Sequence, residues 1–195
     1  MLRRRDVSMN MTTAKETTRL FYALWPDDAT RTALMQLQIN FGGRLTRYEN
    51  LHITLAFLGE QPTALLPALK DLLDHLPKSE MTVTLDRLGY FPRNHIAWVG
   101  MHEVPDALLT FRSKLVQSLV QQDVSFDNRP AFKPHVTLAR DASPPPDIVF
   151  NPIIWQVNQA VLVQSKTQTD GISYRVLASR SLDEEVWTPN ALGER

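Results

Sequence analysis

Asn50-Leu51-His52-Ile53-Thr54-Leu55 holds one of two copies of a His-x-Thr-hydrophobic motif in this chain, and His135-Val136-Thr137-Leu138 holds the other. Each copy lies in an apolar run typical of a β-strand, where residues i and i+2 point to the same face. Each motif therefore presents a His and a Thr together, while the alternate apolar residues anchor the strand to a core. If the two strands face each other across a cleft, they supply two imidazoles, suited to acid and base roles, and two hydroxyls.

The flanks of both motifs extend this pattern. The first copy continues as Ala56-Phe57-Leu58-Gly59-Glu60, and the second stands within Phe132-Lys133-Pro134-His135-Val136-Thr137-Leu138-Ala139-Arg140. With these flanks, the chain resembles the two-histidine phosphoesterase superfamily, and within it the bacterial and archaeal RNA 2′,3′-cyclic phosphodiesterase or 2′-5′ RNA ligase branch. The similarity continues through residues 19–26, 89–100 and 155–165 and at Tyr174. It covers about residues 18 to 182.

The predicted elements form two related halves. A strand at 19–25 precedes a helix that Asp27 or Asp28 can cap and that runs to about residue 40, and the first motif strand follows. A strand at 96–101 and a helix at 104–122 precede the second motif strand. A further helix at 63–76 and strands at 81–88, 155–165 and 173–181 complete the set. The repeated order, with the resemblance, predicts an α+β fold with a bilobal pseudo-two-fold duplication, in which two antiparallel sheets line a central cleft and helices lie outside.

Length and composition fit one domain. The 195 residues, 43% of them hydrophobic, can bury a substantial core, and we expect residues 18–182 to form a single bilobal domain. Residues 1–17 are interpreted as a disordered leader, with Met9 and Met11 as alternative starts, and residues 183–195 as a C-terminal tail. The chain shows no apolar signal-peptide region and no run long enough for a membrane helix, so we expect no membrane association.

Charge and cysteine content narrow the function classes. With 21 basic and 21 acidic residues, the chain as a whole does not attract nucleic acid, so RNA phosphates must meet a local basic patch. Candidates for that patch are Arg44, Arg47, Arg129, Lys133, His135 and Arg140. The absence of cysteine excludes disulfides, thiolate zinc sites and a cysteine nucleophile, and it fits a reducing cytoplasm. We expect a cytoplasmic monomer.

Two motif copies in matching contexts, together with the resemblance, predict that His52 and His135 are catalytic. Because the motifs supply an acid, a base and two hydroxyls and no metal-binding pattern is evident, we expect that neither a metal nor a cofactor takes part. An imidazole has a pKa of about 6.5, so near neutrality one histidine can be neutral while the other is charged. Thr54 and Thr137 can donate hydrogen bonds to non-bridging phosphate oxygens, where charge builds up in the transition state. We assign His52 as the acid and His135 as the base, because the cations around the second motif favour a neutral imidazole.

Arg140 is the third expected phosphate ligand. Strict alternation places it on the face opposite His135 and Thr137, so it reaches the phosphate only through a bulge, a strand end or a curled side chain. The resemblance supports the role, because the family has an arginine just after its second motif.

Other sites find little support in the sequence. His102 has no second histidine at i+4, and His75 and His95 lie in no metal-binding pattern. Gly42-Gly43 lacks the Lys-Ser/Thr of a P-loop, and no Gly-x-Ser-x-Gly elbow is present.

Several functions stay open. The leading hypothesis is hydrolysis of RNA 2′,3′-cyclic phosphate ends to 2′-phosphates, and the same residues run in reverse would join RNA ends, such as tRNA halves, through a 2′-5′ linkage. We favour hydrolysis as the net direction, because water is far more concentrated than RNA ends. The alternatives are a catalytically weak RNA or nucleotide-binding module and a phosphodiesterase of small cyclic or 2′-5′ nucleotides.

Overall fold

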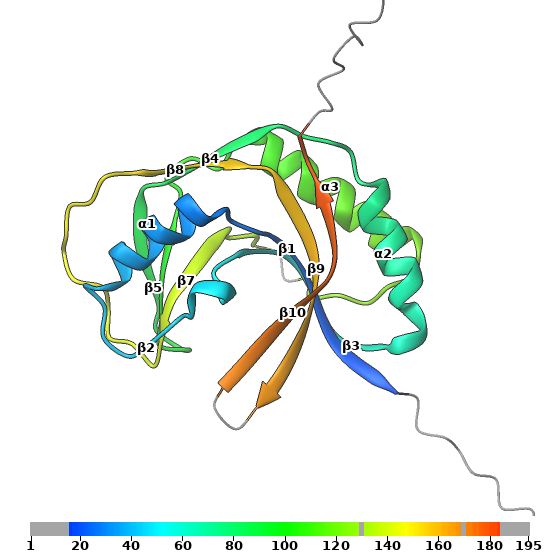
Figure 1. Cartoon of the computed structure of the whole chain (residues 1–195), viewed down its shortest axis with the longest axis horizontal. Helices are drawn as coiled ribbons and strands as arrows, with labels where there is room; N and C mark the ends of the chain where they lie inside the picture. The colour runs from blue at the N-terminus through cyan, green and yellow to red at the C-terminus, as the bar shows by residue number, and fades with distance from the viewer. Residues whose placement is uncertain (1–15, 129–130, 169–170, 184–195) are drawn as a thin grey trace, which may run out of the picture.

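The structure is a computed structural model that describes residues 16–128, 131–168 and 171–183. Its helices and strands follow the predicted order closely (Figure 1). The first half contains β1 (Thr17–Leu24), α1 (Asp28–Gln38), β2 (Arg44–Leu45), the 3₁₀ turn η1 (Tyr48–Asn50), β3 (Ile53–Pro62), the 3₁₀ turn η2 (Thr63–Leu65), α2 (Leu66–His75), β4 (Met81–Leu85) and β5 (Arg87–Phe91). The second half contains β6 (Ile96–Gly100), α3 (Asp106–Gln121), β7 (His135–Arg140), β8 (Ile153–Val157), β9 (Gln159–Gln168) and β10 (Gly171–Ser181).

The strands form two antiparallel sheets. The larger sheet has the order β10-β9-β1-β3-β7-β6-β5, and β2 pairs with β7 beside this path. The smaller sheet is the two-stranded ribbon β4-β8. The predicted α+β class with two antiparallel sheets is therefore confirmed. The lobes do not have separate sheets, however, because β10-β9-β1-β3 and β7-β6-β5 join where β3 meets β7.

Pairing between the halves shows the predicted duplication. Ile53 pairs with Val136 at the junction of β3 and β7, and each residue directly follows its motif histidine. The ribbon likewise pairs β4 of the first half with β8 of the second. The two halves of the chain also exchange strands in the large sheet. β5 of the first half pairs with β6 of the second, and β9 of the second half pairs with β1 of the first. The lobe β10-β9-β1-β3 therefore contains β9 and β10 from the second half of the chain, and the lobe β7-β6-β5 contains β5 and the short β2 from the first half.

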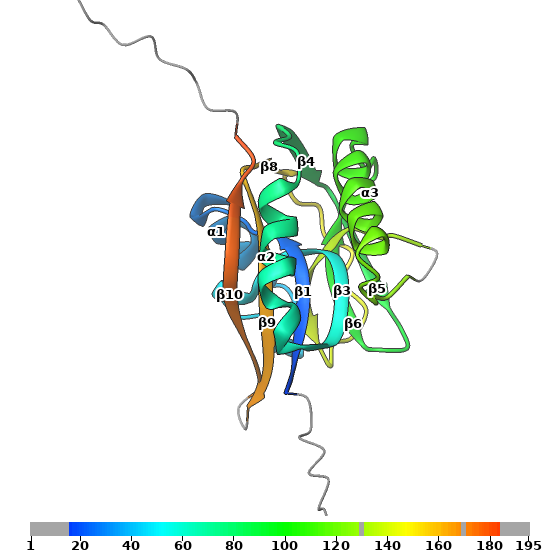
Figure 2. The ribbon, with the colours of Figure 1, turned by 90° about the vertical axis from the view of Figure 1, so that its right-hand side faces the viewer.

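Helices cover one face of the large sheet and leave the other for the cleft. Figure 2 shows α2 lying across β1 and β9, and α2 also contacts β10. Tyr22 of β1 points toward this helix, and its buried hydroxyl donates a hydrogen bond to the Leu69 carbonyl at 2.7 Å. Phe21 and Ala23, the alternate residues, belong to a separate small apolar cluster. Since successive side chains of a strand alternate, that cluster lies on the face away from α2.

α1 is capped at its start and fixed at its end. The Asp27 carboxylate accepts a hydrogen bond from the Thr30 backbone N–H at 2.7 Å, so Asp27 is the N-cap of the two predicted candidates. The helix ends at Gln38, two residues earlier than predicted. The fully buried Gln38 amide donates to the carbonyls of Leu138, at 2.6 Å, and Thr46, at 3.0 Å. This contact fixes the end of α1 against β7, which carries the second motif.

Two predicted strands are each divided in the structure. The expected strand 81–88 ends at Leu85 and resumes at Arg87, and the expected strand 155–165 is interrupted at Asn158. At the first break, the Asp86 backbone N–H donates to the Gly100 carbonyl at 3.0 Å. At the second, the Asn158 carbonyl accepts from the Leu182 N–H at 2.9 Å. At these two points the chain leaves the ribbon and enters the large sheet.

Other details refine the predictions. The expected helix 63–76 begins as the turn η2 and becomes α-helical only from Leu66. The predicted leader and tail lie almost wholly outside the described residues and stay predictions. No helix in the described part of the chain is long and apolar enough to cross a membrane.

Candidate active site

The two His-x-Thr motifs lie side by side at the junction of β3 and β7. Ile53 and Val136, paired across this junction, are fully buried. Alternation therefore directs the residues on either side of them to the opposite face. These residues are His52, Thr54, His135 and Thr137. The same antiparallel register sets each histidine across from the threonine of the other motif.

A β-bulge explains how Arg140 joins Thr137. Between Thr137 and Ala139, the pairing of β7 with β6 shifts by one residue, and Leu138 is left without a partner in β6. Leu138 and Ala139 are both buried, which breaks the alternation of the strand. Arg140 is thereby returned to the face of Thr137, as the sequence required for a phosphate contact. The first motif carries an equivalent shift at Leu55, in the pairing of β3 with β1.

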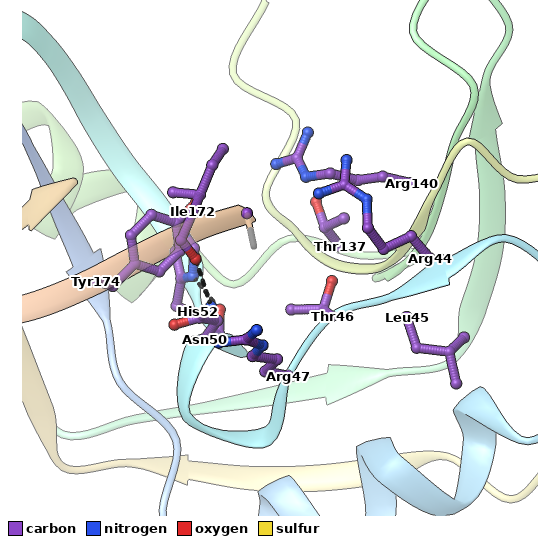
Figure 3. A pocket seen from close by; sticks show the side chains of 11 residues that line it. Arg44, Leu45, Thr46, Arg47, Asn50, His52, Thr137, Arg140, Ile172 and Tyr174 are labelled. Carbon is purple, nitrogen blue, oxygen red and sulfur yellow. Dashed lines mark hydrogen bonds between the residues drawn. The ribbon is translucent and has the colours of Figure 1, made fainter. Parts of the chain in front are cut away.

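A pocket opens beside the motifs, with about 590 Å³ of space free of protein atoms, open solvent included. Its lining residues are Arg44, Leu45, Thr46, Arg47, Asn50, His52, Thr137, Arg140, Gly171, Ile172 and Tyr174 (Figure 3). Three predicted site residues, His52, Thr137 and Arg140, are among them. Thr54 and His135 are not. Thr54 Oγ1 instead lies 3.1 Å from His52 Nε2, in hydrogen-bond contact.

Both histidines are fixed by the same backbone contact. His52 Nδ1 lies 2.6 Å from the Asn50 carbonyl oxygen, and His135 Nδ1 lies 2.6 Å from the Lys133 carbonyl oxygen. A carbonyl can only accept a hydrogen bond, so Nδ1 carries the proton in both rings. The neutral form of each imidazole therefore has its lone pair on Nε2. At His52, Thr54 can donate its hydroxyl proton to that lone pair.

The surroundings hold both imidazoles neutral. Burial lowers the pKa of His52 to about 4, and the hydrogen bond to the Asn50 carbonyl opposes this shift. A protonated His135 would lower the pKa further, and the positive charges of Arg140 and Arg31 also lower it. Burial also lowers the pKa of His135, and the charge of Arg140 adds to that effect. The expectation that one ring is charged near neutrality does not hold for the free protein, because the sequence did not reveal this burial.

Aromatic rings supply much of that burial. His52 has Phe21, Trp25 and Tyr174 around it, with ring centroids at 4.9, 6.0 and 5.3 Å. His135 has Phe91 and Trp98 around it, at 5.1 and 5.8 Å. The segments that hold these rings contributed to the resemblance, but no role in the site was predicted for the rings themselves. Their positions show that they exclude water from the two imidazoles.

Comparison with known proteins places this site in a family. The model of the 2′-5′ RNA ligase superfamily matches residues 26–172. The chain belongs to this superfamily. It is 35% identical over 140 residues to an RNA 2′,3′-cyclic phosphodiesterase of Escherichia coli, covering 67% of this chain and 79% of the relative. It is 32% identical over 190 residues to one of Thermus thermophilus, covering 90% of this chain and 96% of the relative.

Solved structures agree with this membership. The apo crystal structure of E. coli LigT superposes with a TM-score of 0.74 at 29% identity, covering 85% of this chain and 98% of that one. The complex of E. coli LigT with 3′-AMP gives a TM-score of 0.75 at 30% identity, covering 87% and 100%. The predicted fold class is thus also that of family members whose structures are known.

In this superfamily member, the predicted basic patch is only partly assembled at the pocket. Arg44, Arg47 and Arg140 line it, while Lys133 is exposed and contributes its carbonyl to His135. Arg129 lies outside the described residues. Asn50 and Lys133 were missed as positioning groups, because a backbone carbonyl leaves no signal in residue type.

The remaining histidines lie apart from this centre. His102 Nδ1 lies 3.1 Å from Asp86 Oδ1, and His75 contacts Asp71 on the same helix turn. His95 Nδ1 lies 2.9 Å from the Tyr90 hydroxyl. Within residues 16–128, 131–168 and 171–183, no three His, Asp or Glu side chains are grouped so that they could hold a metal ion. Metal independence stays a prediction, to be tested by chelation.

Proposed function

We propose that this chain is an RNA 2′,3′-cyclic phosphodiesterase that opens cyclic phosphate ends to 2′-phosphates without a metal ion. The observation that carries the proposal is the pair of imidazoles, each with Nδ1 bound to a backbone carbonyl and Nε2 available for proton transfer. Membership of the superfamily and the names of the relatives support the same activity.

In the proposed reaction, one imidazole removes a proton from water as its oxygen attacks phosphorus. The bond from phosphorus to the ribose O3′ breaks, and the other imidazole, in its protonated form, donates a proton to that oxygen. The phosphate remains on O2′. Thr54, Thr137 and Arg140 stabilise the charge on the non-bridging oxygens, with Thr137 and Arg140 at the pocket wall. Thr54 would reach the phosphate by exchanging its contact with His52.

The acid must acquire its proton with the substrate. Both imidazoles are neutral in the free protein, and an anionic phosphodiester beside them raises their pKa values. We keep the division predicted from sequence, with His52 as acid and His135 as base. The pKa of His52 is lowered more strongly than that of His135, which favours the opposite assignment, with His52 as base and His135 as acid. The pH profiles of His52→Ala and His135→Ala distinguish the two assignments.

We further propose that the physiological partner is RNA with a cyclic phosphate end, tRNA halves included. The solved complex of E. coli LigT with 3′-AMP supports a nucleotide ligand, and the same residues can run the reaction in reverse as a 2′-5′ ligase. We propose a cytoplasmic monomer, because the proposed substrate is intracellular RNA. A phosphodiesterase of small cyclic or 2′-5′ nucleotides would use the same groups.

The test is incubation of the purified protein with a short RNA bearing a labelled 2′,3′-cyclic phosphate in EDTA. We expect a product with its phosphate on O2′, formed roughly 10² to 10⁴ fold more slowly by the His52→Ala, His135→Ala double variant. A 3′-phosphate product would show that the leaving oxygen is wrongly assigned. Binding without turnover would favour the alternative of a catalytically weak RNA-binding module.

A further inference from the structure

Two arginines of the pocket are directly opposed across a strand pair. Strand β2 is only two residues long, and it pairs Arg44 with Arg140 on β7. Both residues line the pocket. Figure 3 shows their side chains extending in the same direction, toward the side of the pocket that holds Ile172 and Tyr174. Like charges placed opposite each other destabilise a strand pair, and the carboxylate of Asp141 beside Arg44 offsets part of this cost. A bound anion would offset more of it.

Several independent contacts hold β2 in this register. Gly43 has a φ of +87°, and a Cβ on it would lie 2.6 Å from the Arg140 carbonyl oxygen, so only glycine allows the backbones to approach this closely. Beyond β2, the Thr46 N–H donates to the Leu138 carbonyl at 2.8 Å. The buried Gln38 amide bridges the same two residues through their carbonyls. The opposition of the two arginines is thus fixed by the fold.

The Arg44 guanidinium is held so that one edge faces the pocket. Its Nε and Nη2 lie 3.3 and 3.2 Å from Asp141 Oδ2. Its Nη1 is on the opposite side, 3.8 Å from the position that a Cβ on Gly171 would occupy. Gly171 is itself a lining residue. Asp141 therefore binds the Nε and Nη2 donors of Arg44 and leaves Nη1 for the pocket.

We propose that Arg44 binds a second phosphate of the substrate, carried on O5′ of the nucleoside whose cyclic phosphate lies at Arg140. This inference rests on the proposed function. An RNA strand has a phosphate on each side of a ribose, and two arginines on paired strand positions that line one pocket suit two such phosphates. Arg44 then makes the site select an RNA chain end over a free nucleoside cyclic phosphate that has no 5′-phosphate.

The test compares two ligands that differ only in the second phosphate, adenosine 2′,5′-bisphosphate and adenosine 2′-monophosphate. Their Kd values are measured by calorimetry with the full chain, so the result does not depend on turnover. We expect the wild type to prefer the bisphosphate by about tenfold or more, as for a hydrogen bond to a charged group. Arg44→Gln should reduce this preference toward one, and Arg44→Lys, which keeps the charge, should retain part of it.

The matched control is Lys70→Gln, which removes one positive charge from an exposed position on α2. It should keep the wild-type preference. If the wild type shows no preference, or if Arg44→Gln weakens both ligands equally, Arg44 has no role at a second phosphate. Absence of turnover on cyclic phosphate RNA would refute the proposed function but would leave this ratio of Kd values measurable, so the two failures are distinguishable.

Discussion

Ile53 and Val136 are paired at the point where the two halves of the protein meet, and each directly follows the histidine of its motif. Both are fully buried, so the orientation of the neighbouring polar side chains is set by the core. The proposed catalytic groups are therefore anchored where β3 and β7 pair, with His52 directly before β3 and His135 at the start of β7. Two of the residues around them, Arg44 and Arg47, come from β2 and the loop after it.

Replacing either motif histidine should abolish most of the activity without unfolding the protein. His52→Ala and His135→Ala should each reduce kcat by roughly 10² to 10⁴ fold, because each removes one general acid-base group. The double variant should be little slower than the slower single variant, since groups that act as a unit are not additive. Rapid-quench or steady-state kinetics on a cyclic phosphate RNA measure the rates.

The pH dependence of these variants assigns the roles. With His52 as acid and His135 as base, the acidic limb of the wild-type profile should disappear in His135→Ala and the basic limb in His52→Ala. If instead the acidic limb disappears in His52→Ala and the basic limb in His135→Ala, the roles are reversed. The low pKa of His52 favours this outcome. If both limbs survive in either variant, the two-histidine mechanism is wrong.

The phosphate ligands should have smaller effects than the histidines. Thr54→Ala, Thr137→Ala and Arg140→Ala should each slow turnover by roughly 10 to 10³ fold, because each removes one preorganised donor. Thr54→Ser and Thr137→Ser, which keep the hydroxyl, are the matched controls and should recover most of the rate. Wild-type kinetics in all three alanine variants would show that the phosphate is bound elsewhere.

Turnover should persist after chelation. The proposed mechanism assigns the acid, the base and the charge-stabilising donors to side chains of the chain, so dialysis against EDTA should leave kcat within experimental error. The measurement is activity before and after chelation, with each divalent ion added back separately. Specific recovery by a single ion would require a different mechanism.

Folding stability should fall as the pH is lowered from about 6.5 toward 4. Unfolding restores the pKa of His52 from about 4 to its ordinary value, so between these two pH values the unfolded chain binds the additional proton. The lowered pKa of His135 acts in the same direction. Urea unfolding at several pH values should show a shallower dependence in His52→Gln than in the wild type. Equal slopes would mean that the burial of His52 does not affect its titration.

Alanine at two adjacent glycines should have very different consequences. Gly43→Ala should destabilise the protein by about 1–2 kcal/mol or more, because its φ is positive and its Cβ would collide with the β7 backbone. Gly42→Ala is the control, since a Cβ there meets no atom within 4 Å. Thermal unfolding of both variants measures the difference. Similar melting temperatures would show that β2 can move away from β7.

The sequence predicted the repeat, and it offered a bulge as one of three ways for Arg140 to reach the phosphate, because both depend on local alternation around a recognisable motif. It did not predict the breaks at Asp86 and Asn158. Two consecutive polar residues interrupt the apolar alternation at each break, Asp86-Arg87 and Asn158-Gln159, but this interruption does not reveal that the pairing partner changes there. Breaks of this kind depend on strands that lie far away in the sequence.

The pKa of His52 and the charged neighbours within the site also could not be predicted from the sequence. The pKa of His52 depends on burial, and Phe21 and Tyr174, which supply part of it, come from other strands. The opposition of Arg44 and Arg140 likewise exists only once β2 pairs with β7. The sequence proposed which groups form the site, whereas their burial and their neighbours appear only in the folded structure.

The exchange of β5 and β9 between the lobes has a consequence for synthesis on the ribosome. β1 is made early, but one of its edges is covered only by β9, near the end of the described chain. Until β9 has left the exit tunnel, that edge is an open template for pairing with other chains. The nascent chain can therefore contain both histidines before it contains a closed first lobe. Such long-range pairing favours slow folding, during which the open edge of β1 is exposed to other chains.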